Sequence, residues 1–178
     1  MLFRSLDQLS VTSDRDGAAQ FAGNLVLDGI SFARRGDEPL SLTLASHRTA
    51  LRDISIAPID GNMVIEGALD DMLSDIVFEA GTGPTALKLG LPSLSNSVTD
   101  IRASGLAGDM PTVTLVDRIK LDGFTAAFPV GGDQRAKARL EALDISVSGF
   151  EAAGTAVAGA GAAKASGIAM AAGSGKPE

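Results

Sequence analysis

Apolar and polar residues alternate along most of this chain. Between Leu25 and Ala33 an alternating run reaches Asp28-Gly29, and a second alternating run follows it. The same order returns in residues 119–128, and looser copies occur in residues 64–69, 101–106 and 145–150. Because neighbouring side chains of a β-strand point to opposite sides, this period of two predicts strands.

Each copy contains a glycine at its centre. Around Gly29 the apolar positions change phase between Leu27 and Ile30, so a straight strand would exchange its two faces there. Glycine permits a bend or a bulge, and Asp-Gly also favours a two-residue hairpin, so all three structures stay open at this point. We expect five glycines to have this structural role: Gly29, Gly67, Gly105, Gly123 and Gly149. The first three are evenly spaced and the last two are not, which indicates an irregular repeat.

These patterns predict an all-β fold, mainly antiparallel, with irregular repeat-like strands in a curved sheet or a β-solenoid. One segment departs from the pattern. Helical spacing of apolar residues occurs at Leu69, Met72, Leu73 and Ile76. Asp70 and Asp71 would lie in the first turn of such a helix, where the helix dipole favours acidic residues. The sequence therefore predicts one short helix over residues 68–79.

The chain divides into three segments. Residues 1–5 resemble a translated sequencing adapter, which indicates a non-native leader, with native residues as the alternative. Residues 6–150 carry the strand patterns and form the predicted β-rich domain. Residues 151–178 are rich in Ala and Gly and contain few large apolar side chains, so we expect a disordered, low-complexity tail.

Composition narrows the function. A net charge of −7 argues against nucleic acids and anionic membrane surfaces as partners. The absence of Trp and Tyr lowers the expectation of a lectin or a base-stacking protein. Without cysteine there is no disulfide, no catalytic thiol and no zinc site of the cysteine type. No apolar run reaches 18 residues, so we expect no transmembrane segment in this chain.

Candidate chemistry is sparse. His47 is the sole histidine, so it has no second His or Cys with which to form a typical metal or nucleophile site. The acidic residues Asp70, Asp71 and Asp75 are interpreted as the solvent-exposed face of the predicted helix. The alternating Arg135, Lys137 and Arg139 are interpreted as an anion-facing strip or, preferably, as charges that guard a sheet edge or face solvent. We expect no catalytic residue, no metal ligand and no cofactor.

The strand patterns and composition of residues 6–150 resemble those of AsmA-like and related bacterial envelope proteins. The features that carry the resemblance are short strands of the form Leu-x-Leu-Asp-Gly-Phe, few aromatics, and stretches such as residues 143–150. The resemblance implies an all-β domain in the periplasm or cell envelope, exported or anchored by a segment not seen here. It also implies a role in envelope maintenance or in handling lipid through an apolar trough.

The leading hypothesis is a non-enzymatic envelope protein with a structural or lipid-accommodating role, whose partners are lipids or other envelope proteins. A β-solenoid adhesin or surface-assembly protein is the alternative, and an enzyme is the least favoured. A curved sheet with one continuous apolar face would favour lipid contact, whereas stacked coils around a filled interior would favour the solenoid. The sequence leaves the oligomeric state open.

Overall fold

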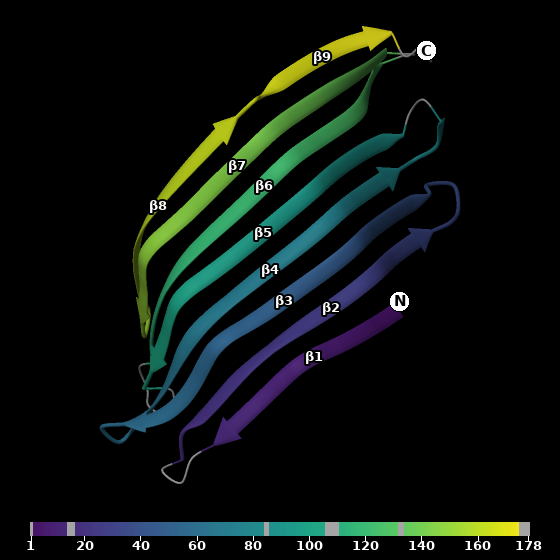
Figure 1. The fold of residues 1–178 in the computed structure, drawn as a ribbon. Coiled ribbons are helices and arrows are strands. Elements are labelled where there is room, and N and C mark those ends of the chain that lie inside the picture. Colours follow the sequence, from purple (N-terminus) through teal and green to yellow (C-terminus); the bar gives the residue numbers. More distant parts are fainter. Residues whose placement is uncertain (1, 14–16, 84–85, 106–110, 132–133, 175–178) are drawn as a thin grey trace.

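The structure, a computed structural model, describes residues 2–13, 17–83, 86–105, 111–131 and 134–174. These residues form one antiparallel sheet in which each strand from β1 to β8 pairs with the next along the chain, and β9 pairs with β7 beyond the end of β8 (Figure 1). The strands are β1 (Leu2–Ser13), β2 (Ala19–Arg34), β3 (Leu40–Ile59), β4 (Asn62–Ala80), β5 (Leu87–Ser104), β6 (Thr112–Gly131), β7 (Gln134–Ala153), β8 (Ala156–Ser166) and β9 (Ala169–Ser174).

The predicted fold class is confirmed. The sheet is curved and open, with β1 at one edge and β8 and β9 at the other (Figure 1). Of the two architectures that the sequence left open, the structure has the curved sheet and not the solenoid. The turn between β3 and β4 shows why the chain reverses so tightly: Asp60 and Gly61 both have positive φ, as the two-residue hairpin turn of an Asp-Gly pair requires.

Register places apolar residues in rows that cross the whole sheet. Cα partners in antiparallel strands lie opposite each other on one face. One such row begins at Phe32 on β2 and continues through Leu42, Phe78, Leu89, Ala126 and Ala138 to Met170 on β9. A second row contains Leu27, His47, Leu73, Leu94, Leu121, Leu143 and Ala165. We call the side that carries these rows the apolar face.

Between these two rows the alternation changes phase at one level of the sheet. At that level three alternate strands carry residues with positive φ, Gly29 on β2, Asp75 on β4 and Gly123 on β6, which we call the bend row. A residue with positive φ interrupts the regular alternation of the pleat. The alternation of apolar positions shifts by one residue at the same level, so the apolar side chains on both sides of the bend row point to one face of the sheet. Gly29 thus lies in a bend within β2, and the hairpin that Asp28-Gly29 also permitted does not form.

A second line of irregularity crosses the sheet at Asp53, Asp100 and Gly149, the bulge row. Each has positive φ, and each lies in a strand that gains one residue relative to both of its neighbours at that level. Members of the bend row are 46 and 48 residues apart, and members of the bulge row are 47 and 49 residues apart. The structural repeat is therefore a two-strand hairpin, and it is longer than the spacing of Gly29, Gly67 and Gly105 suggested.

The helix predicted over residues 68–79 is wrong, because these residues belong to β4. The bend row explains the error. Leu69 and Leu73 follow the period of two, but the phase change at Asp75 puts the next apolar residue of this face, Ile76, three positions after Leu73. A strand with such a step imitates the spacing of a helix.

The Ala/Gly-rich tail also differs from the disorder that we expected. Residues 156–166 and 169–174 form β8 and β9, which pair antiparallel with β7, and the register of β8 is interrupted at the bulge of Gly149. Backbone hydrogen bonds hold these strands, and such bonds do not depend on the size of the side chain. Small side chains therefore do not prevent the tail from extending the sheet.

Candidate functional site

The described residues form a single sheet, so no second layer among them covers its apolar face. The buried hydrophobic residues are few and mostly small: Val64, Ala86, Ala103 and Ala136. Large apolar side chains of the first row remain partly open, with 58% of Phe32 and 39% of Leu42 exposed. Soluble monomeric proteins rarely expose continuous apolar surface of this kind unless something binds there.

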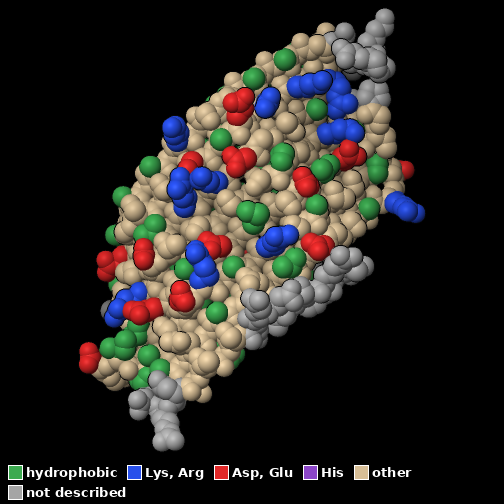
Figure 2. Space-filling view, viewed as in Figure 1, with side chains coloured by type: hydrophobic (Ala, Val, Ile, Leu, Met, Phe, Trp, Pro, Cys, Tyr) green, Lys and Arg blue, Asp and Glu red, His purple; other side chains and the backbone are tan. Residues whose placement is uncertain are grey.

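The opposite, polar face is organised by ion pairs between neighbouring strands. Arg52 pairs with Asp70 at 2.6 Å, and Lys88 pairs with Glu79 at 2.8 Å. Further pairs join Arg102 to Glu66 and Arg118 to Asp144. Figure 2 shows one face of the sheet, with acidic and basic side chains spread over its whole length. This is expected if the polar positions on both sides of the bend row share a face.

The apolar face is interrupted by polar residues on four adjacent strands. His47, Thr49 and Asp71 contact one another: Asp71 Oδ1 lies 3.2 Å from His47 Nε2 and accepts a hydrogen bond from the Thr49 hydroxyl. Asn96 is the Cα partner of Asp71 on the next strand. Asp117 lies two residues before Ile119, the partner of Asn96, so it occupies the diagonal position on β6. We call these five residues the polar cluster.

Two oxygens of the polar cluster lack a hydrogen-bond partner. Asn96 Oδ1 and Asp117 Oδ1 are both buried, and neither accepts a hydrogen bond from the described residues. Leaving a buried acceptor unpaired costs about 1–3 kcal/mol, and more for a charged group, so such atoms are uncommon in folded proteins. The two unpaired oxygens therefore lower the stability of the sheet at this place.

The contacts of His47 do not form a nucleophile–base relay. Its Nε2 lies 3.2 Å from both the Thr49 hydroxyl and Asp71 Oδ1, and Thr49 also donates directly to Asp71. A relay requires one ring nitrogen to face the hydroxyl while the other is oriented by the carboxylate. The three side chains therefore share one set of hydrogen bonds on an open surface.

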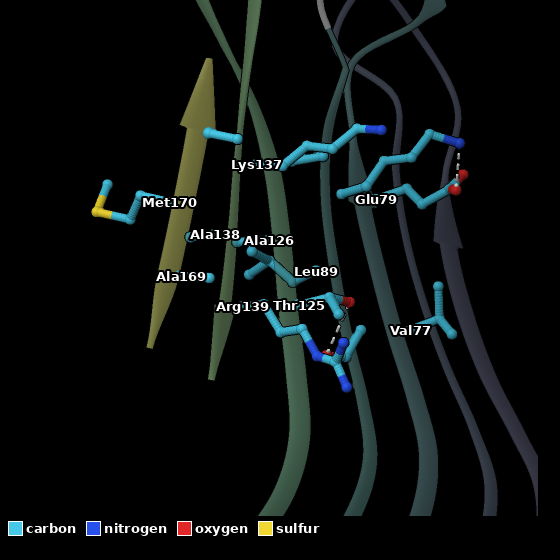
Figure 3. A pocket seen from close by; sticks show the side chains of 14 residues that line it. Val77, Glu79, Leu89, Thr125, Ala126, Lys137, Ala138, Arg139, Ala169 and Met170 are labelled. Atoms are coloured by element: carbon cyan, nitrogen blue, oxygen red, sulfur yellow. Dashed lines mark hydrogen bonds and ion pairs between the residues drawn. The ribbon is translucent and has the colours of Figure 1, made fainter. Parts of the chain in front are cut away.

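The polar face has a shallow hollow of about 520 Å³ near β9. Lys88, Lys137 and Arg139 line it, together with Glu79, which pairs with Lys88 (Figure 3). Met170 points away from Lys137 and Arg139 in Figure 3, as expected for a member of the apolar row.

The basic strip does not guard an edge. Arg135, Lys137 and Arg139 lie on β7, and β9 pairs with β7 over these positions. Arg135 donates a hydrogen bond to the carbonyl oxygen of Ala86 at 2.6 Å, and Arg139 lies 3.8 Å from Glu141. The edge-guarding interpretation is thus wrong, since the tail covers the edge that these residues would have protected, whereas Arg139 is exposed to solvent, with 62% of its side chain accessible.

The three acidic residues assigned to one wet face are separated by the strand. Asp70 lies on the polar face, where it accepts a hydrogen bond from Ser97 at 2.6 Å in addition to pairing with Arg52. Asp71 points to the apolar face as part of the polar cluster, and Asp75 belongs to the bend row. Asn96 and Asp117 were missed in the sequence, although each interrupts an apolar alternation, after Leu94 and before Ile119 respectively.

All five glycines singled out in the sequence have positive φ, namely 62° at Gly29, 155° at Gly67, 68° at Gly105, 75° at Gly123 and 60° at Gly149. They do not share one role. Gly29 and Gly123 belong to the bend row and Gly149 to the bulge row, while Gly105 follows the end of β5. Gly67 faces Ile54 across the β3–β4 pair.

The described residues contain no helix long and apolar enough to span a membrane. They also bring together no group of three or more His, Cys, Asp or Glu side chains that could hold a metal ion. Comparison of the chain with models of protein families, with curated protein sequences and with solved structures finds no match.

Proposed function

We propose that this chain is a non-enzymatic protein of a bacterial cell envelope that accommodates the hydrocarbon chains of lipids on its apolar face. One observation carries the proposal: rows of apolar side chains cross the sheet from β2 to β9 on a face that no second layer of described residues covers. The envelope location follows from the resemblance to AsmA-like proteins and rests on it alone.

The dimensions of the face suit an acyl chain. Neighbouring strands lie about 4.8 Å apart, so a row that crosses seven strands is about 30 Å long. The hydrocarbon core of a bilayer, two acyl chains end to end, is also about 30 Å thick. A single extended chain therefore fits along one row with space to spare.

The energetics favour the same occupant. Each methylene group removed from water contributes about 0.8 kcal/mol, so an acyl chain lying on the rows would gain several kcal/mol even after the cost of ordering it. The ion-paired polar face stays hydrated and keeps the protein dispersed in water. A structural role without lipid would not explain why the apolar side chains of Phe32 and Leu42 are exposed.

Uptake of a fluorescent fatty acid by delipidated protein tests the proposal. We expect saturable binding, weakened about tenfold by Leu94→Gln, since this change puts an amide in the centre of an apolar row. Ser95→Gln is the matched control: the neighbouring residue of β5 points to the polar face, and the change should leave binding unaltered. Absence of saturable uptake, or equal effects of the two variants, would refute lipid accommodation on this face.

A further inference from the structure

The hollow near β9 has an uncharged floor on the polar face of the sheet. Two neighbouring cross-strand rows form it, and the residues at its floor are small: Gly90, Ala127, Ala169 and Ala171. Gly90 keeps the floor low, because a Cβ atom at this position would lie 2.9 Å from the Thr125 hydroxyl oxygen. The floor therefore leaves space between the longer side chains around it.

Those longer side chains are basic and come from two strands. Lys88 belongs to β5, and Lys137 and Arg139 belong to β7. Lys88 and Lys137 are both Cα partners of Ala127, one on each side of it, so their backbones lie about 10 Å apart. Figure 3 shows Lys137 and Arg139 on the same side of the sheet. The three cationic groups can thus converge on one small anion above Ala127.

The positive charge of the hollow is incompletely neutralised. Its lining contains three cationic side chains and one carboxylate, that of Glu79, which pairs with Lys88 at 2.8 Å. Lys137 pairs with no acidic side chain in the part of the chain that the structure describes. Arg139 lies 3.8 Å from Glu141, and both are exposed, so this contact neutralises little. The hollow is therefore locally basic in a chain whose net charge is −7.

We propose that this hollow binds a phosphate monoester, carried by a small organic phosphate or by a lipid headgroup. Such a group carries about −1.5 to −2 charges at neutral pH and has three terminal oxygen acceptors. These match the excess positive charge of the lining and the N–H donors of Lys88, Lys137 and Arg139. A carboxylate has a single charge and two oxygens. The volume of about 520 Å³ leaves room over the floor for the carbon skeleton of the ester.

The site goes beyond the proposed function because it lies on the other face of the sheet. Hydrocarbon is assigned to the apolar face, and a lipid bound there cannot pass its own headgroup through the sheet to the hollow. A headgroup in the hollow would belong to a bilayer that faces the polar side. Lys88 and Arg139 are 51% and 62% exposed at their side chains, so a ligand from either source can reach them.

Isothermal titration of the full chain with glycerol 3-phosphate and with glycerate, which differ in the anionic group, tests the site. The phosphate should bind at least tenfold more tightly, and Lys137→Gln should weaken its binding about tenfold. Lys120→Gln is the matched control: Lys120 is an exposed lysine of the polar face outside the hollow, and its loss changes the net charge equally. A second arm measures sedimentation with phosphatidylcholine vesicles, with and without phosphatidic acid.

The two arms distinguish the sources of phosphate. Tight binding of glycerol 3-phosphate that only Lys137→Gln weakens would support a soluble ester. Binding confined to vesicles that contain phosphatidic acid, with the same dependence on Lys137, would support a headgroup. Equal affinity for phosphate and glycerate without such vesicle binding, equal effects of the two variants, or no binding in either arm would overturn the site. None of these results bears on fatty-acid uptake by the apolar face, so the two proposals fail separately.

Discussion

Gly67 of β4 lies directly against Ile54 of β3, so that a Cβ atom on Gly67 would be 2.9 Å from the Ile54 Cα atom. This approach lets the Ile54 side chain cover the glycine and continue the apolar row to Ile101, the Cα partner of Gly67 on β5. The glycine is therefore required by contact as well as by its φ of 155°.

Replacing Gly67 tests that contact. We expect Gly67→Ala to lower the free energy of unfolding by about 2–3 kcal/mol, because the new methyl group meets backbone and its φ becomes strained. Urea denaturation followed by circular dichroism measures the change. Gly173→Ala is the control, since a Cβ there has nothing within 4 Å and should change stability little. Equal stability of the two variants would contradict the packing described for Gly67.

The bend row predicts opposite effects for one chemical change at two positions. Asp75 has a φ of 51°, so Asp75→Gly should keep the free energy of unfolding or raise it by up to about 1 kcal/mol. Asp122 directly precedes the bend at Gly123 but does not itself have a positive φ. The same change there should lower the free energy of unfolding by about 0.5–1 kcal/mol, because glycine loses more conformational entropy on folding. Thermal unfolding of both variants measures the pair, and a loss at Asp75 as large as that at Asp122 would argue against a bend there.

The ion pair between β6 and β7 predicts a pH response. Arg118 Nε donates a hydrogen bond to Asp144 Oδ1 at 3.1 Å, and this hydrogen bond lowers the pKa of the Asp144 carboxyl below its ordinary value. A lowered pKa in the folded state means that the pair stabilises the fold above the ordinary pKa of an aspartate. This contribution is lost as the pH falls through the lowered pKa.

Titration of the carboxyl carbon by NMR would locate the Asp144 midpoint. We expect it below the ordinary value in the unmodified protein and closer to that value in Arg118→Leu. Arg48→Leu, also on the polar face but outside this ion pair, should leave the midpoint in place. A midpoint that Arg118→Leu does not move would show that the pair does not persist in solution.

The last strand should be the least protected part of the sheet. β9 pairs with β7 alone and consists of small side chains except Met170, whereas β4 is hydrogen-bonded to strands on both sides. Amides in β9 should therefore exchange with solvent much faster than those in the middle of β4, because local opening breaks fewer contacts. Hydrogen exchange with mass spectrometry measures both segments in one experiment. Similar protection of both would mean that the tail is held by more than its pairing with β7.

Several elements could be predicted from local pattern because strand formation depends on it. The alternation from Leu40 to Leu44 and the Asp-Gly turn at Asp60 and Gly61 each act over a few residues. The bend and bulge rows were only half visible, since Asp53, Asp75 and Asp100 take the positive φ that glycine takes elsewhere. Asp adopts positive φ less readily than Gly, so an Asp within a strand pattern does not by itself predict a bend.

The polar cluster shows what a single strand cannot reveal. Asp71 follows Asp70 in the sequence, and on β4 the two point to opposite faces. Its neighbours His47 and Asn96 are each more than twenty residues away, and only the register of β3 with β4 and of β4 with β5 brings them together. The sequence around each of these polar residues does not indicate which polar residues of other strands will lie next to it.

The sequence by itself determined that this chain forms strands with one apolar and one polar side, because period-two alternation acts on each residue and its immediate neighbours. Only the tertiary structure decided that the strands form an open curved sheet, that the tail completes its edge, and that the interruptions gather on adjacent strands. Those outcomes depend on which strands pair and in which register, and backbone hydrogen bonds between distant segments select both.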